Sequence, residues 1–410
     1  MAKEDPYAPL RIKSFRLYIV ALFAFTLATQ MQAVVVGWQM YKATHDPLAL
    51  GLIGLAEALP FIGLALFAGH VADKHNRKRI SVAALSVLLA IASGLLVLTL
   101  LAPGGTPTRI WPIFALISLS GVARSFLTPA RQALSAELAP RDLWRSAIAW
   151  RGSTWQLAAV LGPALGGILY GFAGPHVAYA VDATFLALGL GCMAALEYTP
   201  RKVEALAEPI MAALTSGLRH VFTQPIVLSA ISLDLFAVLF GGATALLPIF
   251  ASEILRVGPQ WLGVLQSAPA AGSVVMSLVL AHWPPRRNIG KTLLGAVTVF
   301  GMCMIGFAFS RNLALSIGLL AVGGMADNVS VVIRGTLLQI LTPDHLLGRV
   351  SAVNSIFVGS SNEIGAFESG VTAKLMGAVP SVVLGGVMTL LVVATLSWRA
   401  PQLRKLREID

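Results

Sequence analysis

Ten ionisable side chains lie inside stretches of this chain that are otherwise apolar. An ionisable group in the middle of a bilayer costs at least about 2.5 to 3.5 kcal/mol on insertion scales, so each one is a candidate for a functional role. A carboxyl group away from water changes its proton affinity when a guanidinium group approaches or leaves, whereas an arginine keeps its proton. The carboxyl groups are therefore the groups that can carry protons. The acids are Glu57, Asp182, Asp234, Asp327, Glu363 and Glu368, and the bases are Arg124, Arg131, Arg151 and Arg334.

An internal repeat helps to rank these charges. A basic segment that starts at Gly69 recurs in degraded form 212 residues later, and a second offset of 203 residues covers the rest of each half. Two related membrane halves are typical of a secondary transporter. The matched positions are Pro47 with Pro259, Gly51 with Gly263, His70 with His282 and Asn76 with Asn288 at the first offset, and Arg131 with Arg334, Pro140 with Pro343, Gly162 with Gly365 and Gly167 with Gly370 at the second.

Arg124 and Asp327 occupy equivalent positions of this repeat with opposite charge. Each lies near the middle of its apolar span and seven residues before an arginine, which places the two residues of each span on one helical face. The alternative role for any one of the ten charges is an ion pair that serves folding alone. We therefore rank Asp327, Asp234 and Arg124 as the first candidates for coupling or substrate binding.

The composition indicates a polytopic membrane protein, because 56% of residues are hydrophobic, 12% are charged and the mean hydropathy is +0.78. Such values lie outside the range of soluble globular chains. A hydrocarbon core of about 30 Å needs roughly 20 apolar residues per helix. We expect twelve spans, near 16 to 41, 48 to 72, 80 to 101, 111 to 137, 143 to 172, 176 to 196, 226 to 252, 260 to 283, 291 to 310, 313 to 341, 346 to 374 and 378 to 398.

The spans fall into two six-helix bundles, which we expect at 16–197 and 226–399. Short cytoplasmic tails (1–15 and 400–410) and a cytoplasmic linker with an interfacial helix (198–225) complete this organisation. With both termini on one side, that side carries 21 Lys and Arg residues against five on the other. The positive-inside rule then places both termini and the basic segment in the cytoplasm. The net charge of +11 therefore reflects topology and contact with lipid rather than a nucleic-acid partner.

The sequence lacks the residue patterns of disulfides, metal sites and ATP-binding loops. Cys192 and Cys303 lie inside expected spans, so neither a disulfide nor a metal site is implied, and there is no Walker A loop for ATP. We expect no enzyme activity and no cofactor, with a proton gradient as the energy source. Sodium stays open as the alternative coupling ion, because carboxylate and carbonyl oxygens suit hard cations.

The loop after the second span resembles the signature of the major facilitator superfamily, at Gly69, Asp73, Lys74, Lys78 and Arg79. It departs at Asn76, where the signature has a glycine; Asn tolerates a left-handed turn. Further matches resemble the branch that contains bacterial enterobactin exporters and similar efflux proteins. These are Arg16 through Trp38 to Tyr41, Phe126 to Arg131, Gly162 to Gly167, Asp327 to Arg334 and Gly348 to Asn354.

The resemblance implies the all-helical major facilitator fold, in which the first, fourth, seventh and tenth helices line a central path. Arg124 and Asp327 would then face each other or a substrate, and Asp234 would lie on a third lining helix. Glu57 and Glu363 come next, because their helices meet across the two bundles in this fold; Arg334 and Arg151 complete the candidate set. Asp182 and Glu368 fall near the expected outer surface, where solvation or interface pairing is the expected role.

The resemblance also implies two motifs that move or pack helices. The first is a cytoplasmic latch that holds the outward-facing state, formed by Gly69, Asp73, Lys74, Arg77, Lys78, Arg79, Arg131 and Glu137. Its alternative is a basic loop that sets topology alone. The second, at Gly162, Pro163, Gly166 and Gly167, resembles the end of an antiporter signature and combines a helix breaker with small residues. The drug-antiporter arginine of the fourth helix is absent, since Ser118 precedes Gly121, and Arg124 is its substitute.

These features favour a proton-coupled exporter of an amphipathic organic molecule, such as a siderophore or drugs, that works as a monomer in a bacterial inner membrane by rocker-switch alternating access. A lipid or lysolipid transporter of the same fold is the alternative within transport. A non-transporting receptor or assembly factor is the alternative of another class. The ten charges inside the spans argue against it, because a protein without transport has no need to keep their cost.

Overall fold

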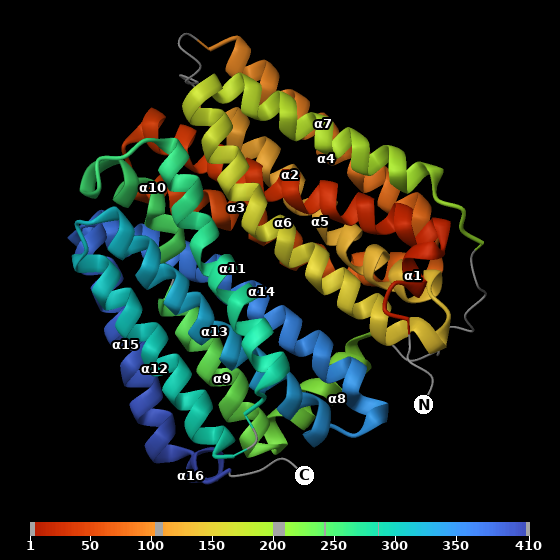
Figure 1. The fold of residues 1–410 in the computed structure, drawn as a ribbon, viewed down its shortest axis with the longest axis vertical. Helices are drawn as coiled ribbons and strands as arrows, with labels where there is room; N and C mark the ends of the chain where they lie inside the picture. The colour runs from red at the N-terminus through yellow and green to blue at the C-terminus, as the bar shows by residue number, and fades with distance from the viewer. Residues whose placement is uncertain (1–4, 103–109, 200–209, 242, 286, 407–410) are drawn as a thin grey trace. The chain divides into compact units, whose positions relative to one another are not determined.

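The computed structural model describes residues 5–102, 110–199, 210–241, 243–285 and 287–406, and these residues are almost entirely helical (Figure 1). The helices of the first half are α1 (Ala8–Arg11), α2 (Lys13–Thr44), α3 (Pro47–Lys74), α4 (Arg77–Leu100), α5 (Trp111–Leu138), α6 (Trp144–Ala173) and α7 (Pro175–Ala195). They are followed by α8 (Ile210–Thr223), α9 (Pro225–Phe240), α10 (Leu247–Ile249), α11 (Pro259–His282), α12 (Ile289–Phe309), α13 (Leu313–Leu341), α14 (Asp344–Met376), α15 (Ala378–Arg399) and α16 (Pro401–Arg404).

Eleven helical segments in the described part of the chain are long and apolar enough to cross a membrane. The twelfth expected span is α14, a helix of 33 residues. It is more polar than the others, with Asn362, Glu363 and Glu368 along its second half. The helical membrane architecture predicted from hydropathy is confirmed, and the most polar span is the one that hydropathy describes least well.

The described chain divides into two compact units. Unit 1 comprises residues 1–43, 56–207 and 259–263, and unit 2 comprises 44–55, 208–258 and 264–410. The first turns of α3 belong to unit 2 and the first turn of α11 belongs to unit 1. The two six-helix bundles expected from the sequence stay a prediction. The cytoplasmic placement of the linker stays a prediction; its residues 200–209 lie outside the described part of the chain.

In unit 1, glycines allow helices to pack backbone to backbone. A Cβ atom added at Gly162 would lie 2.6 Å from the Cβ of Gln30 on α2, and one at Gly166 would lie 2.9 Å from the carbonyl oxygen of Met31. The buried side chains of Leu27 and Met31 fill this contact between α2 and α6. The close packing expected from the small residues of the α6 motif is therefore present. Any larger side chain at these positions would push the two helices apart.

Gly167, at the end of the same motif, packs against the first turn of α11, where an added Cβ would lie 2.8 Å from the Cα of Gly263. Unit 2 contains the equivalent arrangement at Gly370 of α14, whose added Cβ would lie 2.9 Å from the Cα of Gly51 on α3. The two contacts join positions that the repeat makes equivalent.

Unit 2 has its core where α9, α12, α13 and α15 meet. Figure 1 shows α12 beside α13 and α15, and Leu293 and Leu337 are completely buried between these helices. The terminal α16 packs against α12. Just after α16, the carbonyl oxygen of Leu406 accepts a hydrogen bond of 3.1 Å from the amide of Gly290 at the start of α12.

The seventh expected span, 226–252, is not one continuous helix. The helix α9 ends at Phe240, a short 3-10 helix covers Ala243–Leu246, and α10 runs into a π-helical turn at Phe250–Ile254. Gly241 closes α9 by donating its amide to the carbonyl oxygen of Ala237. Glycine is a poor helix former and Pro248 has no amide to continue the ladder, so the break falls where the sequence supports a helix least.

Candidate functional site

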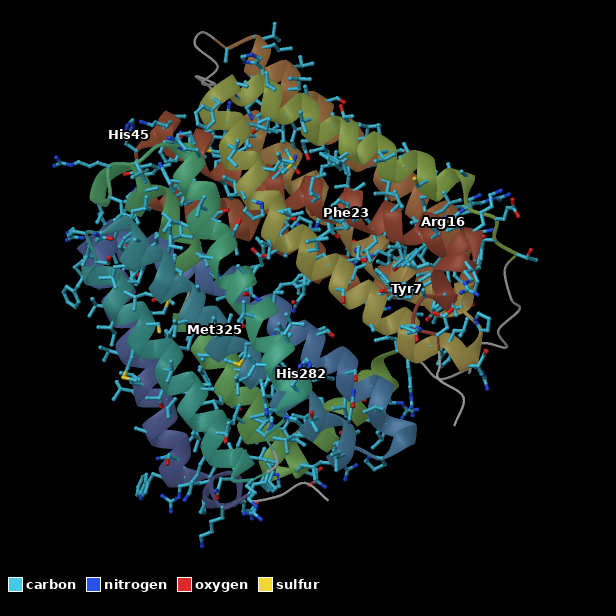
Figure 2. The ribbon with its side chains drawn as sticks, viewed as in Figure 1. Tyr7, Arg16, Phe23, His45, His282 and Met325 are labelled. Atoms are coloured by element: carbon cyan, nitrogen blue, oxygen red, sulfur yellow. The ribbon has the colours of Figure 1, made fainter. Side chains whose placement is uncertain are left out.

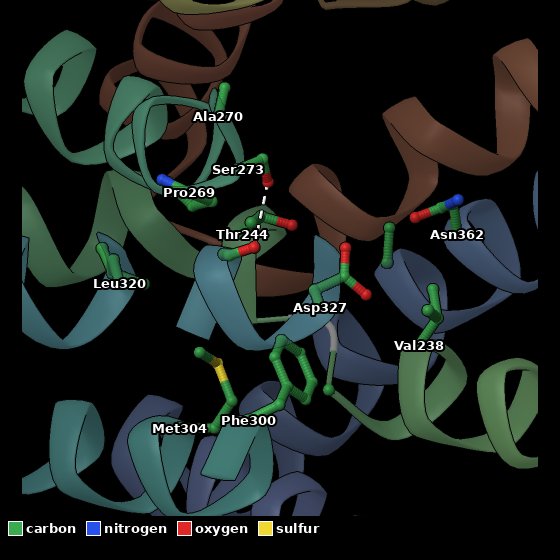
Figure 3. Close-up of a pocket in the computed structure, with 13 residues that line it drawn as sticks. Val238, Thr244, Pro269, Ala270, Ser273, Phe300, Met304, Leu320, Asp327 and Asn362 are labelled. Atoms are coloured by element: carbon green, nitrogen blue, oxygen red, sulfur yellow. Dashed lines mark hydrogen bonds between the residues drawn. The ribbon is translucent and has the colours of Figure 1, made fainter. Parts of the chain in front are cut away.

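Asp327 lies in unit 2 on the wall of a cavity of about 210 Å³. The cavity is lined by Val238, Gly241, Thr244, Pro269, Ala270, Ser273, Phe300, Met304, Leu320, Gly324, Asp327, Asn362 and Ala366. Figure 3 shows the carboxylate of Asp327 pointing into the space between Thr244, Phe300 and Asn362. Of the residues ranked from the sequence, Asp327 is the one in the lining of this cavity.

Two glycines and a proline bring α11 and α13 close together beside this cavity. A Cβ atom added at Gly324 would overlap the carbonyl oxygen of Pro269, and one added at Gly272 would overlap the carbonyl oxygen of Ala321. Ser273 adds a hydrogen bond of 3.0 Å from its hydroxyl to the carbonyl oxygen of Gly324. Asp327 therefore projects from a part of α13 that is fixed against α11, which gives its carboxylate a defined position.

Asp234 and Arg334 form an ion pair inside unit 2, and their side chains are only 4% and 6% exposed. Asp234 lies on α9 and Arg334 lies on α13, two turns beyond Asp327. Both residues were candidates for coupling or binding, and neither lines the described cavity. Each charge has the other as its partner, which is the arrangement expected of a pair that supports folding.

Arg124 on α5 forms an ion pair with Glu57 on α3 within unit 1. A Cβ atom added at Gly121 would overlap the carbonyl oxygen of Glu57, so the two helices touch one turn before Arg124. The sequence did not predict this pairing. Arg124 and Asp327 belong to different units, and their coupling stays a prediction.

Arg131 and Arg151 share a polar site in unit 1. The hydroxyl of Tyr18 donates to the carbonyl oxygen of Arg131, whose guanidinium lies 5.3 Å from the ring centre of Phe25. Arg151 donates a hydrogen bond of 2.7 Å to the hydroxyl of Ser135. The guanidinium of Arg131 therefore lies against α2, and its expected role in the latch stays a prediction.

Asp182 differs most from its expected environment. It was expected near the outer surface, but it is 1% exposed in α7. Neither carboxylate oxygen has a hydrogen-bond partner in the described structure. Tyr179, one turn earlier, donates to the side-chain oxygen of Gln39, whose amide donates to Thr99. Asp182 therefore lies next to a buried polar network without joining it.

Glu363 and Glu368 both lie on α14. An oxygen of Glu363 would be 3.0 Å from a Cβ added at Gly54, so this side chain reaches the first turns of α3 within unit 2. Glu368 is partly buried and lies outside the lining of the described cavity.

The expected latch residues form a smaller cluster around Glu137 at the ends of α3, α4 and α5. Arg77 pairs with Glu137 and lies 3.9 Å from Asp73, while the hydroxyl of Tyr198 donates to Glu137 from the segment after α7. Burial raises the pKa of Tyr198 to about 12, and its hydrogen bond to Glu137 acts in the same direction.

The asparagines of the two basic segments behave differently. Asn76 is extended and caps α4, because its side chain accepts a hydrogen bond of 3.1 Å from the amide of Arg79. The left-handed conformation occurs instead at its equivalent, Asn288, with φ of 55°. Asn76 therefore replaces the signature glycine as a helix cap rather than as a left-handed residue.

The histidines lie near helix ends or between helices. Figure 2 shows His45 beside the start of α3 and His282 at the end of α11. Among the described residues there is no cluster of three or more His, Cys, Asp or Glu side chains that could hold a metal ion.

Sequence reasoning missed most of the cavity wall. Phe300, Met304, Ser273 and Thr244 carry no motif and no charge in the sequence, and their position follows from helix packing alone. Asn362 was visible only as one of several amides within the spans. The break in the seventh span was detectable, because Gly241 and Gly242 are adjacent and Pro248 follows.

The family model described as "transmembrane secretion effector" matches residues 4–410, which is nearly the whole chain. The chain belongs to this family of the major facilitator superfamily. It is 24% identical over 388 residues to the multidrug efflux pump Tap of Mycolicibacterium fortuitum, with coverage of 90% of this chain and 91% of Tap. It is 26% identical over 403 residues to the enterobactin exporter EntS of Escherichia coli O6:K15:H31, with coverage of 96% and 94%.

The fold is also that of solved transporters. A bacterial homologue of the human lysosomal transporter Spinster has a TM-score of 0.72 and 14% identity, with 98% of each chain covered. This family member is therefore a multi-pass membrane transporter of the major facilitator fold rather than an enzyme. Asp327, which the repeat ranked first, lines a cavity of that fold.

Proposed function

We propose that the protein is a proton-coupled exporter of an amphipathic organic molecule, which works by alternating access. The observation that carries this proposal is the placement of Asp327 on the wall of a cavity while Asp234 and Glu57 each pair with an arginine. A carboxyl group beside a cavity can exchange a proton with an incoming ligand, whereas a carboxylate held by a guanidinium is already neutralised. The efflux roles of the relatives support the export direction.

The proposal includes a bacterial inner membrane with both termini in the cytoplasm, a monomer, and no bound cofactor. The distribution of Lys and Arg supports this orientation, since 21 of them lie on the side that carries the termini against five on the other. The proton gradient is the energy source and lipid is the surrounding partner.

The cluster around Glu137 supports a cytoplasmic latch as part of this mechanism. Arg77 contacts both Asp73 and Glu137, so a change at Asp73 reaches α5 through one guanidinium. We expect Asp73→Asn to alter the conformational balance while substrate still binds, because the latch residues lie outside the cavity lining.

Proteoliposomes with an imposed pH gradient test the function. A panel of cationic dyes, catecholates and lysolipids is offered to the native protein and to Asp327→Asn. At least one compound should accumulate with the gradient, and the variant should fall to the level of empty liposomes. Equal transport by the variant, or transport that follows a sodium gradient and ignores pH, overturns proton coupling at Asp327. Accumulation of lysolipids alone would assign the protein to lipid transport.

A second measurement separates Asp327 from the other acids. Substrate-induced proton release in detergent is compared for the amide variants of Asp234, Asp327, Glu57 and Glu363. We expect Asp327→Asn to abolish the release. Release that equals that of the native protein in all four variants contradicts the proposal.

A further inference from the structure

The charge of the Asp327 cavity points to the class of substrate. Of the residues that line it, Asp327 is the one that carries a charge, and the described lining contains no lysine, arginine or histidine. The described structure gives the Asp327 carboxylate no ion pair. An ionised carboxylate among apolar side chains is costly unless a cation or hydrogen-bond donors reach it. A positively charged group that enters the cavity would supply that missing partner.

The remaining polar side chains of the wall point the same way. The amide nitrogen of Asn362 uses one of its two hydrogens in a hydrogen bond of 2.9 Å to the carbonyl oxygen of Val358, and Figure 3 shows its side-chain oxygen on the side of Asp327. The hydroxyl of Ser273 donates its hydrogen to the carbonyl oxygen of Gly324, so it can only accept hydrogen bonds from a ligand in the cavity. Thr244 supplies the remaining hydroxyl of the lining. The wall is therefore rich in acceptors, and a ligand that donates hydrogen bonds or carries positive charge fits it.

The broken seventh span adds a further negative potential. Gly241 lies both at the C-terminal end of α9 and on the cavity wall. The last carbonyl groups of a helix carry a partial negative charge, which stabilises cations placed near them. A continuous helix through this segment would not end here, so the break brings the C-terminal end of α9 to the cavity wall at Val238 and Gly241.

The other side of the cavity is lined by apolar side chains, among them an aromatic ring and a flexible methionine. Phe300, Met304 and Leu320 form part of the lining, and Figure 3 shows the Phe300 ring next to Asp327. An aromatic face attracts an organic cation, and a methionine adapts to its shape. A volume of about 210 Å³ is below that of typical pockets for whole drug-sized ligands. The cavity therefore suits the head group of a larger molecule.

We propose that this cavity binds the positively charged amine or quaternary ammonium head of a lipophilic substrate, with Asp327 as counter-ion and Phe300 against the head group. This inference rests on the proposed function and names its substrate class. It favours organic cations over anionic catecholates. Proton and substrate then compete for one carboxylate, which couples their movements.

Equilibrium binding to the purified protein in detergent tests the proposal without any gradient. Trimethylphenylammonium is titrated at pH 7.5 by calorimetry, with benzenesulfonate as an anion of similar size. The native protein should bind the cation and not the anion. Asp327→Asn should weaken cation binding by about 10- to 100-fold, the loss of a charge-assisted contact. Phe300→Leu should weaken it by several fold.

Two variants control for folding and for charge in general. Asp327→Glu keeps the carboxylate and should retain most of the affinity, and Glu368→Gln removes an acid that does not line the cavity and should bind like the native protein. Equal binding of the anion, or an affinity unchanged by Asp327→Asn, overturns the proposal. Displacement of the ammonium ion by millimolar sodium also overturns it, because the cavity would then be a site for the inorganic ion.

The two proposals fail separately. If the protein binds cations through Asp327 but transports nothing when a pH gradient is imposed, the proposed transport mechanism is wrong and the proposed binding site stands. If the protein transports a catecholate with a proton gradient but does not bind ammonium ions, the proposed cation site is wrong and the proposed exporter function stands.

Discussion

Arg334 on α13 is paired with Asp234 on α9, and both side chains are buried within unit 2. Its equivalent in the repeat, Arg131 on α5, contacts Tyr18 and Phe25 on α2 instead. In each half of the chain, this arginine lies on the fourth membrane span and contacts the first span of the same half. A carboxylate is its partner only in the second half. This difference separates charges that hold helices together from the charge that faces the cavity.

Asp234→Asn should destabilise the protein by about 3 to 5 kcal/mol, because it leaves the buried guanidinium of Arg334 without a counter-ion. The measurement is the midpoint of thermal unfolding in detergent. The double variant Asp234→Leu with Arg334→Met should recover most of the loss, since it removes both buried charges. A midpoint that does not change in Asp234→Asn would show that the pair has no structural role.

Asp182→Asn should have the opposite effect. The carboxylate of Asp182 is buried without a hydrogen-bond partner, so its replacement by an amide, which cannot ionise, relieves the cost of burying a charge. We expect a higher midpoint of unfolding, measured in the same detergent as for Asp234→Asn. If the midpoint falls as it does for Asp234→Asn, Asp182 has a partner in solution that the described structure lacks.

Glu57 and Arg124 should be energetically coupled. A double-mutant cycle with Glu57→Gln and Arg124→Gln should give an interaction energy of about 1 kcal/mol, reduced from that of a buried pair because the side chains are 23% and 40% exposed.

A second double-mutant cycle, measured on transport rate with Arg124→Gln and Asp327→Asn, tests the predicted coupling of those two residues. Additive losses in the second cycle would show that they share no interaction.

The ion pair between Asp46 and Lys374 should give a pH-dependent contribution to stability. The hydrogen bond from Lys374 at 2.7 Å holds the pKa of Asp46 below its usual value. Its stabilisation is therefore present above the unfolded-state pKa of about 3.9 and is lost as the pH falls through the lower folded-state value. The stability difference between native protein and Asp46→Asn should disappear on acidification and shrink at high salt. A difference that is constant with pH refutes this.

Gly324→Ala should disrupt the wall that carries Asp327, because its Cβ would overlap the backbone of Pro269. Gly318→Ala is the matched control on the same helix, since a Cβ there meets nothing within 4 Å. We expect the control to gain about 0.4 to 1 kcal/mol of stability, and Gly324→Ala to lose both stability and transport. Similar behaviour of the two variants would mean that α11 and α13 are not packed tightly at this point.

Hydropathy and the repeat predicted the helical membrane architecture because both depend on properties that a linear sequence carries, namely the length of apolar runs and the spacing of charges. The cost of a charge in the bilayer likewise identified Asp327. The pairing of Arg124 with Glu57 was hidden, because residues 67 positions apart meet only through the approach of α3 and α5 at Gly121.

Asp182 shows that the position of a residue along a membrane span does not predict its burial. Its position along α7 placed it near an expected boundary, but its burial depends on which helices cover that face, and α4 packs against α7. The cavity wall was also hidden, since apolar residues such as Phe300 differ from core residues only by the space beside them.

The glycine contacts on α3 and α6 have an evolutionary consequence. Gly167 meets Gly263, while Gly370 meets Gly51, and each pair exchanges the two positions that the repeat makes equivalent. An isologous dimer has the same property, because residue i of one copy contacts residue j of the other and the reverse contact also occurs. Two copies of one ancestral half would therefore make this glycine crossing twice.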